Sequence, residues 1–194
     1  MTNIAIVYHS GFGHTKVVAE HVAKGAASIA GTTANLFKAE DLASPDSGPW
    51  EELARADAII FGAPTYMGSA SAPMKQFLDA SSKVWFTQGW KDKIAAGFTN
   101  SAAWSGDKFA TLSQFAVVAA QHGMIWAGLG LMPGNNSSKA SIEDVNRVGS
   151  FLGLMTQANV DESAEIAPPQ ADRKTAELFG ARIAHVAARW KKGG

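Results

Sequence analysis

The sequence predicts an α/β protein in which a doubly wound sheet of five parallel strands has helices on both faces. Strand-like and helix-like segments alternate along the chain, which is the order that βαβ units produce. The strand-like segments are apolar almost throughout, as in strands that are buried on both faces. The 194 residues are enough for a large core, and no linker or repeat divides them. We therefore expect residues 1–194 to form a single domain.

Each of the five expected strands is a short apolar run that ends at turn residues. The runs lie at residues 3–9, 32–39, 57–64, 93–100 and 124–132. The third run, DAIIFGAP, has the clearest pattern, whereas the second is weaker. Because helical patterns separate the runs, the strands should all point the same way.

The expected helices follow apolar residues spaced three and four apart. The first begins at about His14 and ends before Gly31, and a short one follows Pro49. The next two lie within residues 71–85 and 107–123, and the last runs from about 171 to 190. Residues 133–169 show no clear pattern, and we expect a long irregular segment there before the last helix.

Charge and cysteine content exclude several classes of protein. The chain has 17 basic and 17 acidic residues, so its net charge is zero, and no stripe of Lys and Arg predicts nucleic-acid binding. Without cysteine the chain has no disulfide, thiolate nucleophile or cysteine-based metal centre. The histidines show no metal-ligand spacing, so no metal site is expected. We expect a cytoplasmic protein without membrane insertion, because the start lacks a signal-peptide pattern and no run of about 18 apolar residues occurs.

The loop after the first expected strand is the first candidate for a ligand site. It reads SGFGHT, from Ser10 to Thr15, and leads directly into a helix. Its two glycines allow a sharp turn with backbone N–H groups pointing inward, and the helix adds the positive end of its dipole. The loop is neither a Walker motif nor a full dinucleotide fingerprint. It is therefore either an ordinary strand-to-helix turn or an uncharged cradle for a phosphate.

Two further loops of small residues follow the third and fourth expected strands. The first reads GAPTYMGSAS (residues 62–71), and the second reads FTNSAAWSG (residues 98–106). Because ligands collect where parallel strands end, we expect the three loops to lie together at one edge of the sheet. Backbone that carries small side chains can approach a flat ring closely. Together the three loops predict a ligand with a phosphate and a planar head group.

These segments resemble the flavodoxin-fold FMN proteins, and most closely the WrbA-type NAD(P)H:quinone oxidoreductases. The likeness covers about residues 4–190, and its most specific part is Gly-x-Pro-Thr-x-x-Gly leading into Met-x-x-Phe-Leu-Asp, here GAPTYMGSASAPMKQFLD. The segments KIAAGFTNSAAWSGDK and AAQHGMIWAGLGL also match. The resemblance implies a flavodoxin-like fold and non-covalently bound FMN.

The resemblance also implies which residues touch the cofactor. The FMN phosphate would be held by Ser10, Gly11, Phe12, Gly13, His14 and Thr15, although His14 fits a solvated first-turn position equally well. One edge of the isoalloxazine and ribityl chain would be lined by Pro64, Thr65, Tyr66, Met67 and Gly68. The other side would be closed by Asn100, Ser101, Ala102, Ala103, Trp104 and Ser105. Trp85 matches a family tryptophan beside the quinone and nicotinamide position, and Phe12 would form a further wall for the substrate.

Three positions depart from the family pattern. The family's third loop is rich in glycine, whereas Trp104 here narrows or reshapes the pocket. A family histidine that approaches the flavin is Gln121 here. For the following His122, a structural role is at least as well supported as a contact with the flavin. A family tyrosine of the phosphate loop is Phe12, which keeps the ring but loses the hydroxyl. These changes bear on the substrate more than on FMN.

The resemblance implies an enzyme that transfers two electrons from NADH or NADPH to a quinone. Both substrates would use one site in a ping-pong cycle, without a catalytic side chain, in a homodimer or homotetramer. A flavodoxin-type electron carrier is an alternative, but such carriers are usually acidic because they dock on basic partners, and the net charge here is zero. An FMN-binding interaction protein without NAD(P)H turnover also stays open. A receiver domain does not fit, because His9–Ser10 and Ala63–Pro64 stand where it needs acidic residues.

Overall fold

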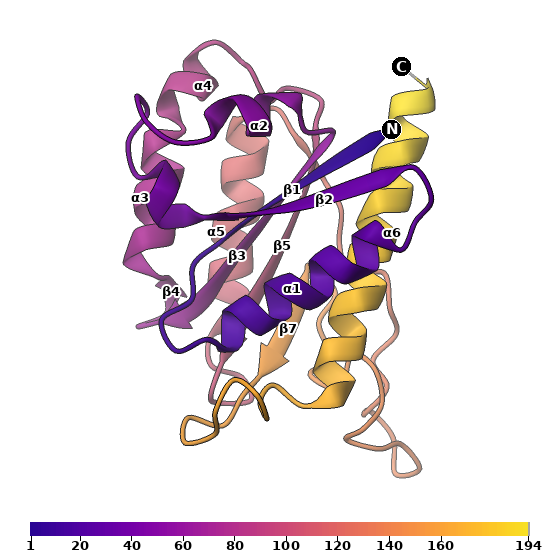
Figure 1. Cartoon of the computed structure of the whole chain (residues 1–194). Coiled ribbons are helices and arrows are strands. Elements are labelled where there is room, and N and C mark those ends of the chain that lie inside the picture. Colours follow the sequence, from indigo (N-terminus) through magenta and orange to yellow (C-terminus); the bar gives the residue numbers. More distant parts are fainter. Residues whose placement is uncertain (194) are drawn as a thin grey trace.

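The computed structural model of the chain describes residues 1–193, and its centre is a parallel sheet (Figure 1). Across the sheet the order is β2 (Thr32–Lys38), β1 (Thr2–Tyr8), β3 (Ala58–Tyr66), β5 (Ile94–Ser101) and β6 (Ile125–Trp126), with every neighbouring pair parallel. The chain adds β2 on one side of β1 and all later strands on the other. This order confirms the predicted doubly wound α/β fold.

Two short strands share the last position of the sheet. β6 pairs with the first residues of β5, and β7 (Leu154–Gln157) pairs with its last four residues, from Phe98 to Ser101. The strand expected at 124–132 is therefore wrong beyond Trp126, and part of the expected irregular segment is a strand. Leu129 explains the error, because it is fully buried in the core without belonging to a strand, and its apolar pattern reflects that burial.

Helices cover both faces of the sheet, as predicted (Figure 1). One face carries α1 (His14–Ala27) and α6 (Gln170–Gly193). The other face carries the 3-10 helix η1 (Ala39–Leu42), α2 (Trp50–Arg55), α3 (Ala72–Ala80), α4 (Ser82–Phe86) and α5 (Lys108–Gln121). The pattern at 71–85 thus forms two helices, and a short strand β4 (Ser69–Ala70) pairs antiparallel with β3 before them. Within residues 1–193, no helix has both the length and the apolarity to cross a membrane.

Alternate side chains of the strands enter two separate cores. On β1, Ile4 and Ile6 pack beneath α1 and α6, while Ala5 and Val7 pack on the opposite face. The two helices of the first face approach each other closely at a glycine of α6. A Cβ on Gly180 would lie 2.0 Å from the carbonyl oxygen of Val22, so only glycine permits this crossing.

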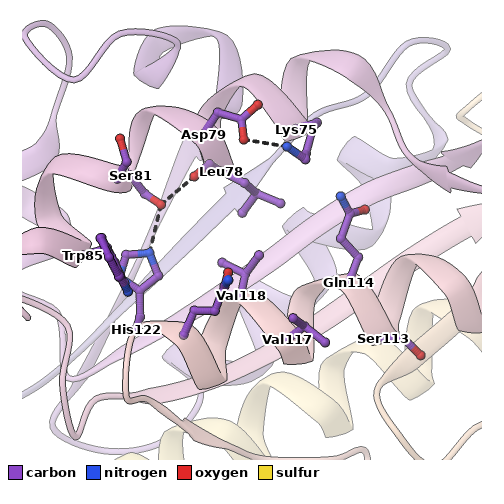
Figure 2. A pocket seen from close by; sticks show the side chains of 12 residues that line it. Lys75, Leu78, Asp79, Ser81, Trp85, Ser113, Gln114, Val117, Val118 and His122 are labelled. Atoms are coloured by element: carbon purple, nitrogen blue, oxygen red, sulfur yellow. Dashed lines mark hydrogen bonds and ion pairs between the residues drawn. The ribbon is translucent and has the colours of Figure 1, made fainter.

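A cavity of about 530 Å³ separates α3 and α4 from the C-terminal half of α5 (Figure 2). Its lining includes Leu78, Trp85, Val117, Val118, Gln121 and His122. The Ser81 hydroxyl donates to the Leu78 carbonyl oxygen at 2.7 Å and lies 2.9 Å from His122 Nε2. Because that hydroxyl has only one proton, Nε2 of His122 carries its own proton and donates it. Burial lowers the pKa of His122, so the ring stays neutral and serves to join the helices.

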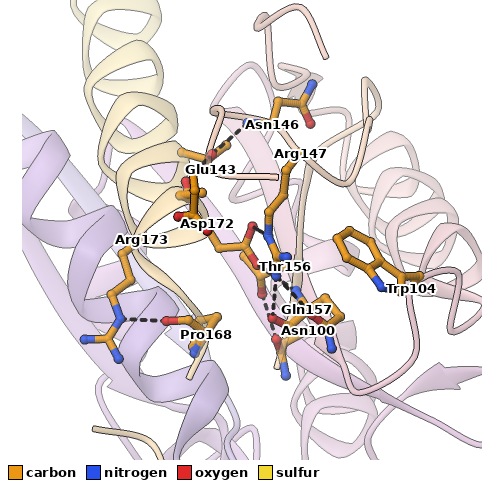
Figure 3. Close-up of polar contacts among 12 residues, drawn as sticks. Asn100, Trp104, Glu143, Asn146, Arg147, Thr156, Gln157, Pro168, Asp172 and Arg173 are labelled. Carbon is orange, nitrogen blue, oxygen red and sulfur yellow. Dashed lines mark hydrogen bonds and ion pairs between the residues drawn. The ribbon is translucent and has the colours of Figure 1, made fainter. Parts of the chain in front are cut away.

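A buried ion pair joins the segment between β6 and β7 to α6 (Figure 3). Arg147 donates from Nε to Asp172 Oδ1 at 2.8 Å and from Nη2 to Oδ2 at 3.0 Å, and the exposed fractions of the two side chains are 4% and 2%. The same Nη2 donates to the main-chain and side-chain oxygens of Gln157, each at 3.0 Å. Asp172 Oδ2 also accepts the N–H of Gln157 at 2.8 Å. One network therefore fixes the end of β7 against α6.

Replacing Asp172 by Asn should destabilise the protein strongly, because Arg147 would keep its buried charge and lose the opposite one. We expect the free energy of unfolding in urea to fall by about 3–5 kcal/mol. The matched control is Asp79→Asn, which removes an exposed pair with Lys75 on α3 and should change stability by about 0–1 kcal/mol. Similar losses in the two variants would contradict the importance of the buried network.

Candidate functional site

The carboxyl ends of the strands form the candidate site, beside the point where the strand order reverses. That point lies between β1 and β3, because the chain leaves β1 in one direction for β2 and in the other for β3. Open α/β sheets bind ligands at such a point. A cavity of about 200 Å³ lies there, lined by Phe12, His14, Thr15, Pro64, Thr65, Tyr66, Asn100, Ser101, Ala102, Ala158 and Val160. The three loops singled out in the sequence therefore do meet.

The loop after β1 is shaped as an anion cradle. Ser10 Oγ accepts hydrogen bonds from the N–H groups of Gly13 and Lys16, both at 3.1 Å, and so holds the turn closed. Gly13 has a φ of +91°, which favours glycine, and α1 begins at the next residue. No acceptor within residues 1–193 is found for the N–H groups of Gly11, Phe12, His14 and Thr15. These free donors, together with the positive end of the helix dipole, suit an anion.

Two aromatic side chains form the rim of the cavity. The ring of Phe12 is 79% exposed and meets the edge of Tyr66 with their centroids 6.4 Å apart. Burial raises the pKa of Tyr66, so its phenol is neutral at ordinary pH. A Cβ on Gly11 would lie 2.6 Å from the Tyr66 hydroxyl, so a side chain there would push the Tyr66 ring away from the loop. Met67 next to it is fully exposed, with a φ of +48°.

Hydroxyl groups below the cavity fix the side chains of its floor. Thr65 Oγ1 lies 2.8 Å from Thr99 Oγ1 and 2.7 Å from Thr111 Oγ1, which joins β3, β5 and α5. Thr156 of β7 donates to Asn100 Oδ1 at 2.8 Å. Because the amide oxygen of Asn100 is taken, its amide nitrogen is the group left to donate in the cavity. The floor is therefore polar, uncharged and rigidly held.

His14 faces the loop that follows β7. Its Nε2 lies 2.8 Å from the carbonyl oxygen of Glu162, so this nitrogen donates to the protein, and the residue is buried. The structure thus gives His14 a role in holding that loop, while contact with a phosphate stays a prediction. Sequence reasoning missed Ala158 and Val160 of the same loop. The signal was weak, because β7 has only four residues, and a strand that short has no readable period.

Three of the aromatic and polar residues expected at the site line other cavities of the structure. Trp104 lines a third cavity beside Lys108, and the guanidinium of Arg147 lies 4.6 Å from the centre of its ring. Gln121 lines the cavity between α3, α4 and α5. Trp85 lines the same cavity (Figure 2). Gln121 is the last residue of α5. It lies about 20 Å along the helix from Lys108, the first residue of α5, which follows the site loop. Within one chain, neither Gln121 nor Trp85 is brought to the loops.

The remaining expected residues belong to the site loops without lining the cavity. They are Ser10, Gly11, Gly13, Met67, Gly68, Ala103 and Ser105. Gly68 has a φ of +80°, which permits the turn between β3 and β4. Among residues 1–193, no three side chains that commonly bind metals gather in one place.

Comparisons with known proteins agree with this geometry. The family model of NADPH-dependent FMN reductases matches residues 9–135. The chain is 41% identical to the protein named flavodoxin FldP of Pseudomonas aeruginosa, over 96% of this chain and 97% of that protein. It is 31% identical to an NAD(P)H dehydrogenase (quinone) of Trichlorobacter lovleyi, over 97% and 98% of the two chains.

A solved structure is similar over almost the same length. It is a flavodoxin, WrbA-like protein of Agrobacterium tumefaciens, with 40% identity and a TM-score of 0.73 over 97% of this chain and 99% of that one. The family assignment rests on two findings. The family model covers more than half of the chain, and the relatives match nearly all of it. The chain belongs to the NADPH-dependent FMN reductase family and is a flavodoxin-fold FMN protein close to the WrbA type.

Proposed function

We propose that the protein transfers two electrons from NADH or NADPH to a quinone through bound FMN, in a ping-pong cycle at one site. The observation that carries the proposal is the open, uncharged cradle at the reversal of strand order, with an exposed aromatic rim beside it. The family and the relatives named NAD(P)H dehydrogenase (quinone) support this class of reaction. Quinone as the acceptor and the order of the two half-reactions are parts of the proposal.

The residues present fit FMN. The N–H groups of Gly11, Phe12, His14 and Thr15 would receive the phosphate, since they have no acceptor within residues 1–193 and adjoin the start of α1. The loops at 64–68 and 100–105 would lie along the edges of the ring, where small side chains let the backbone come close. FMN supplies the chemistry when bound, because it takes up a hydride from a nicotinamide and passes two electrons on.

The protein's own contribution is binding and orientation. Apart from His14 and Tyr66, the side chains that line the cavity do not titrate, and the pKa of Tyr66 lies above its ordinary value. Among residues 1–193 no carboxylate lines the cavity, and Nε2 of His14 already donates to the carbonyl oxygen of Glu162. The exposed ring of Phe12 would instead form a wall against which a flat substrate can stack.

An electron carrier is the second candidate function, and one observation favours it. The relative with 41% identity bears the name flavodoxin. A carrier must dock on a redox partner, and such docking usually depends on charge of one sign. The balance of 17 basic and 17 acidic residues offers no such charge, so we place the enzyme first.

A homo-oligomer would account for Trp85 and Gln121. Both line a cavity remote from the site of their own chain, and Trp85 is 46% exposed beside Phe86, which is 83% exposed. A dimer or tetramer would let these side chains approach the flavin of a neighbouring copy. Sedimentation velocity of the FMN-loaded protein should therefore give the mass of a dimer or tetramer, and a monomer at all concentrations would contradict the proposal.

Replacing Ser10 and Thr15 together by Ala should weaken FMN binding. Ser10 holds the turn through two backbone N–H groups, and Thr15 lines the cavity at the first turn of α1. We expect a loss of roughly 1–3 kcal/mol in binding free energy, measured by quenching of flavin fluorescence on titration of the apoprotein. An unchanged FMN affinity would refute the phosphate assignment.

The test of the reaction is an anaerobic absorbance titration of the FMN-loaded protein, first with NADH and then with NADPH. Rapid bleaching of the flavin band that a quinone reverses is the expected result. Tight FMN binding without bleaching by either nucleotide would favour the electron carrier instead.

A further inference from the structure

Lys108 is a fully buried cation directly behind the loop at 101–105. It is the first residue of α5, and its side chain turns back to that loop. Its Nζ donates to Ser101 Oγ at 2.7 Å and to the carbonyl oxygens of Ala103 at 2.9 Å and Trp104 at 2.8 Å. An ammonium group has three donors, so all of its hydrogen bonds are used on this single loop.

The position of Lys108 is electrostatically unfavourable in three ways. The side chain is desolvated, because its residue is 0% exposed. No carboxylate within residues 1–193 lies close enough to form a salt bridge with it. It also stands at the N-terminus of a helix, where the dipole disfavours a positive charge. All three of its acceptors are neutral oxygens, so its charge has no opposite charge at contact distance.

The same loop is held from its other side by the Arg147 network (Figure 3). Gln157 Nε2 donates to the carbonyl oxygen of Ala102 at 2.8 Å, and Arg147 lies against the ring of Trp104. The carbonyl groups of residues 102–104 are thus all bound within the protein. No acceptor within residues 1–193 is found for the N–H groups of residues 102–105. Of these residues Ala102 lines the cavity, so its N–H group is free to donate to a ligand there.

The charges around this loop leave one positive charge uncompensated. Asp172 neutralises Arg147 through two hydrogen bonds, so the pair carries no net charge. Lys108 has no such partner, and its charge lies one residue layer behind Ser101 and Ala102, which line the cavity. In a buried position this charge is weakly screened.

We propose that Lys108 is a positioning residue for the flavin, which fixes the 101–105 loop and favours the negatively charged, reduced cofactor through its unpaired charge. The inference rests on the proposed function in one respect, namely that this loop borders the flavin ring. It extends that function, because it identifies a residue that does not touch the cofactor yet sets how tightly its two redox states are bound.

The titration of Lys108 predicts the direction in which FMN affinity changes with pH. Burial lowers the pKa of Lys108 to about 8, while Asp172 raises it and Arg147 lowers it. A bound anion favours the charged lysine, so FMN binding takes up a proton and its affinity should fall as the pH rises through 8. The stability of the apoprotein changes with pH in the opposite direction. The unfolded lysine keeps its proton up to about 10.5, so this group adds stability as the pH rises from 8 toward 10.5.

The test compares Lys108→Met with Lys93→Met. Lys93 is a matched control, because its Nζ also donates to two carbonyl oxygens, those of Ala54 and Ala56, and burial likewise lowers its pKa. It precedes β5 and so lies at the opposite edge of the sheet. The readouts are the FMN dissociation constant of the apoprotein on both sides of pH 8, and the midpoint potential of bound FMN measured with a chemical reductant.

We expect Lys108→Met to raise the dissociation constant of FMN by about tenfold, because the variant loses both a weakly screened buried charge near the cofactor and the three hydrogen bonds that fix the 101–105 loop. Its affinity should no longer depend on pH near 8, and its midpoint potential should become more negative. Lys93→Met should leave affinity and potential unchanged.

Unchanged affinity and potential in Lys108→Met, or equal changes in both variants, would overturn the proposal. If Lys108→Met does not fold, Lys108→Gln takes its place, because it keeps hydrogen-bond donors and removes the charge. Unchanged affinity and potential in that variant would contradict the proposal. Neither readout needs NAD(P)H, so absence of enzymatic turnover would refute the proposed function without touching this inference.

Discussion

Parallel pairing of β1 with β3 and of β3 with β5 determines where each part of the site lies. Because the three strands run the same way and lie side by side, the loops that follow them end at one edge of the sheet. The reversal of strand order between β1 and β3 leaves a crevice at that edge. The cradle of N–H groups, the aromatic rim and the polar floor are all consequences of this arrangement.

The site itself is uncharged, and the charges that act on it are buried behind it. Its lining offers backbone N–H groups, hydroxyl groups and one amide, which suit a phosphate and a polar ring edge without fixing a charge in the cavity. Arg147, Asp172 and Lys108 lie in the layer behind. Lys108 binds two carbonyl groups of the 101–105 loop directly, while Arg147 and Asp172 hold Gln157, whose amide binds the Ala102 carbonyl. This separation lets the protein influence a cofactor electrostatically while its contact surface stays neutral.

The last strand position shows how distant segments complete a site. β6 and β7 are separated by 27 residues, from Ala127 to Gly153, and only β7 reaches the carboxyl edge. The loop after β7 brings Ala158 and Val160 to the cavity and contacts His14. A continuous strand at 124–132 would have put other residues there. Because the strand is interrupted, the loop after β7 can line the cavity beside the other three loops.

Local patterns in the sequence were enough to predict most of the strands and helices that frame the sheet and the three loops at its edge, because apolar period and glycine placement act over a few residues. The family followed instead from the resemblance of longer motifs, above all GAPTYMGSASAPMKQFLD. The tertiary structure alone decided the pairing of β7, the burial of Lys108 and the remoteness of Gln121 and Trp85 from the site. Each of these depends on which residues far apart in the chain pack together, and a local period carries no information about that. The sequence pattern therefore predicts the loops of the site, while tertiary packing determines which side chains line it.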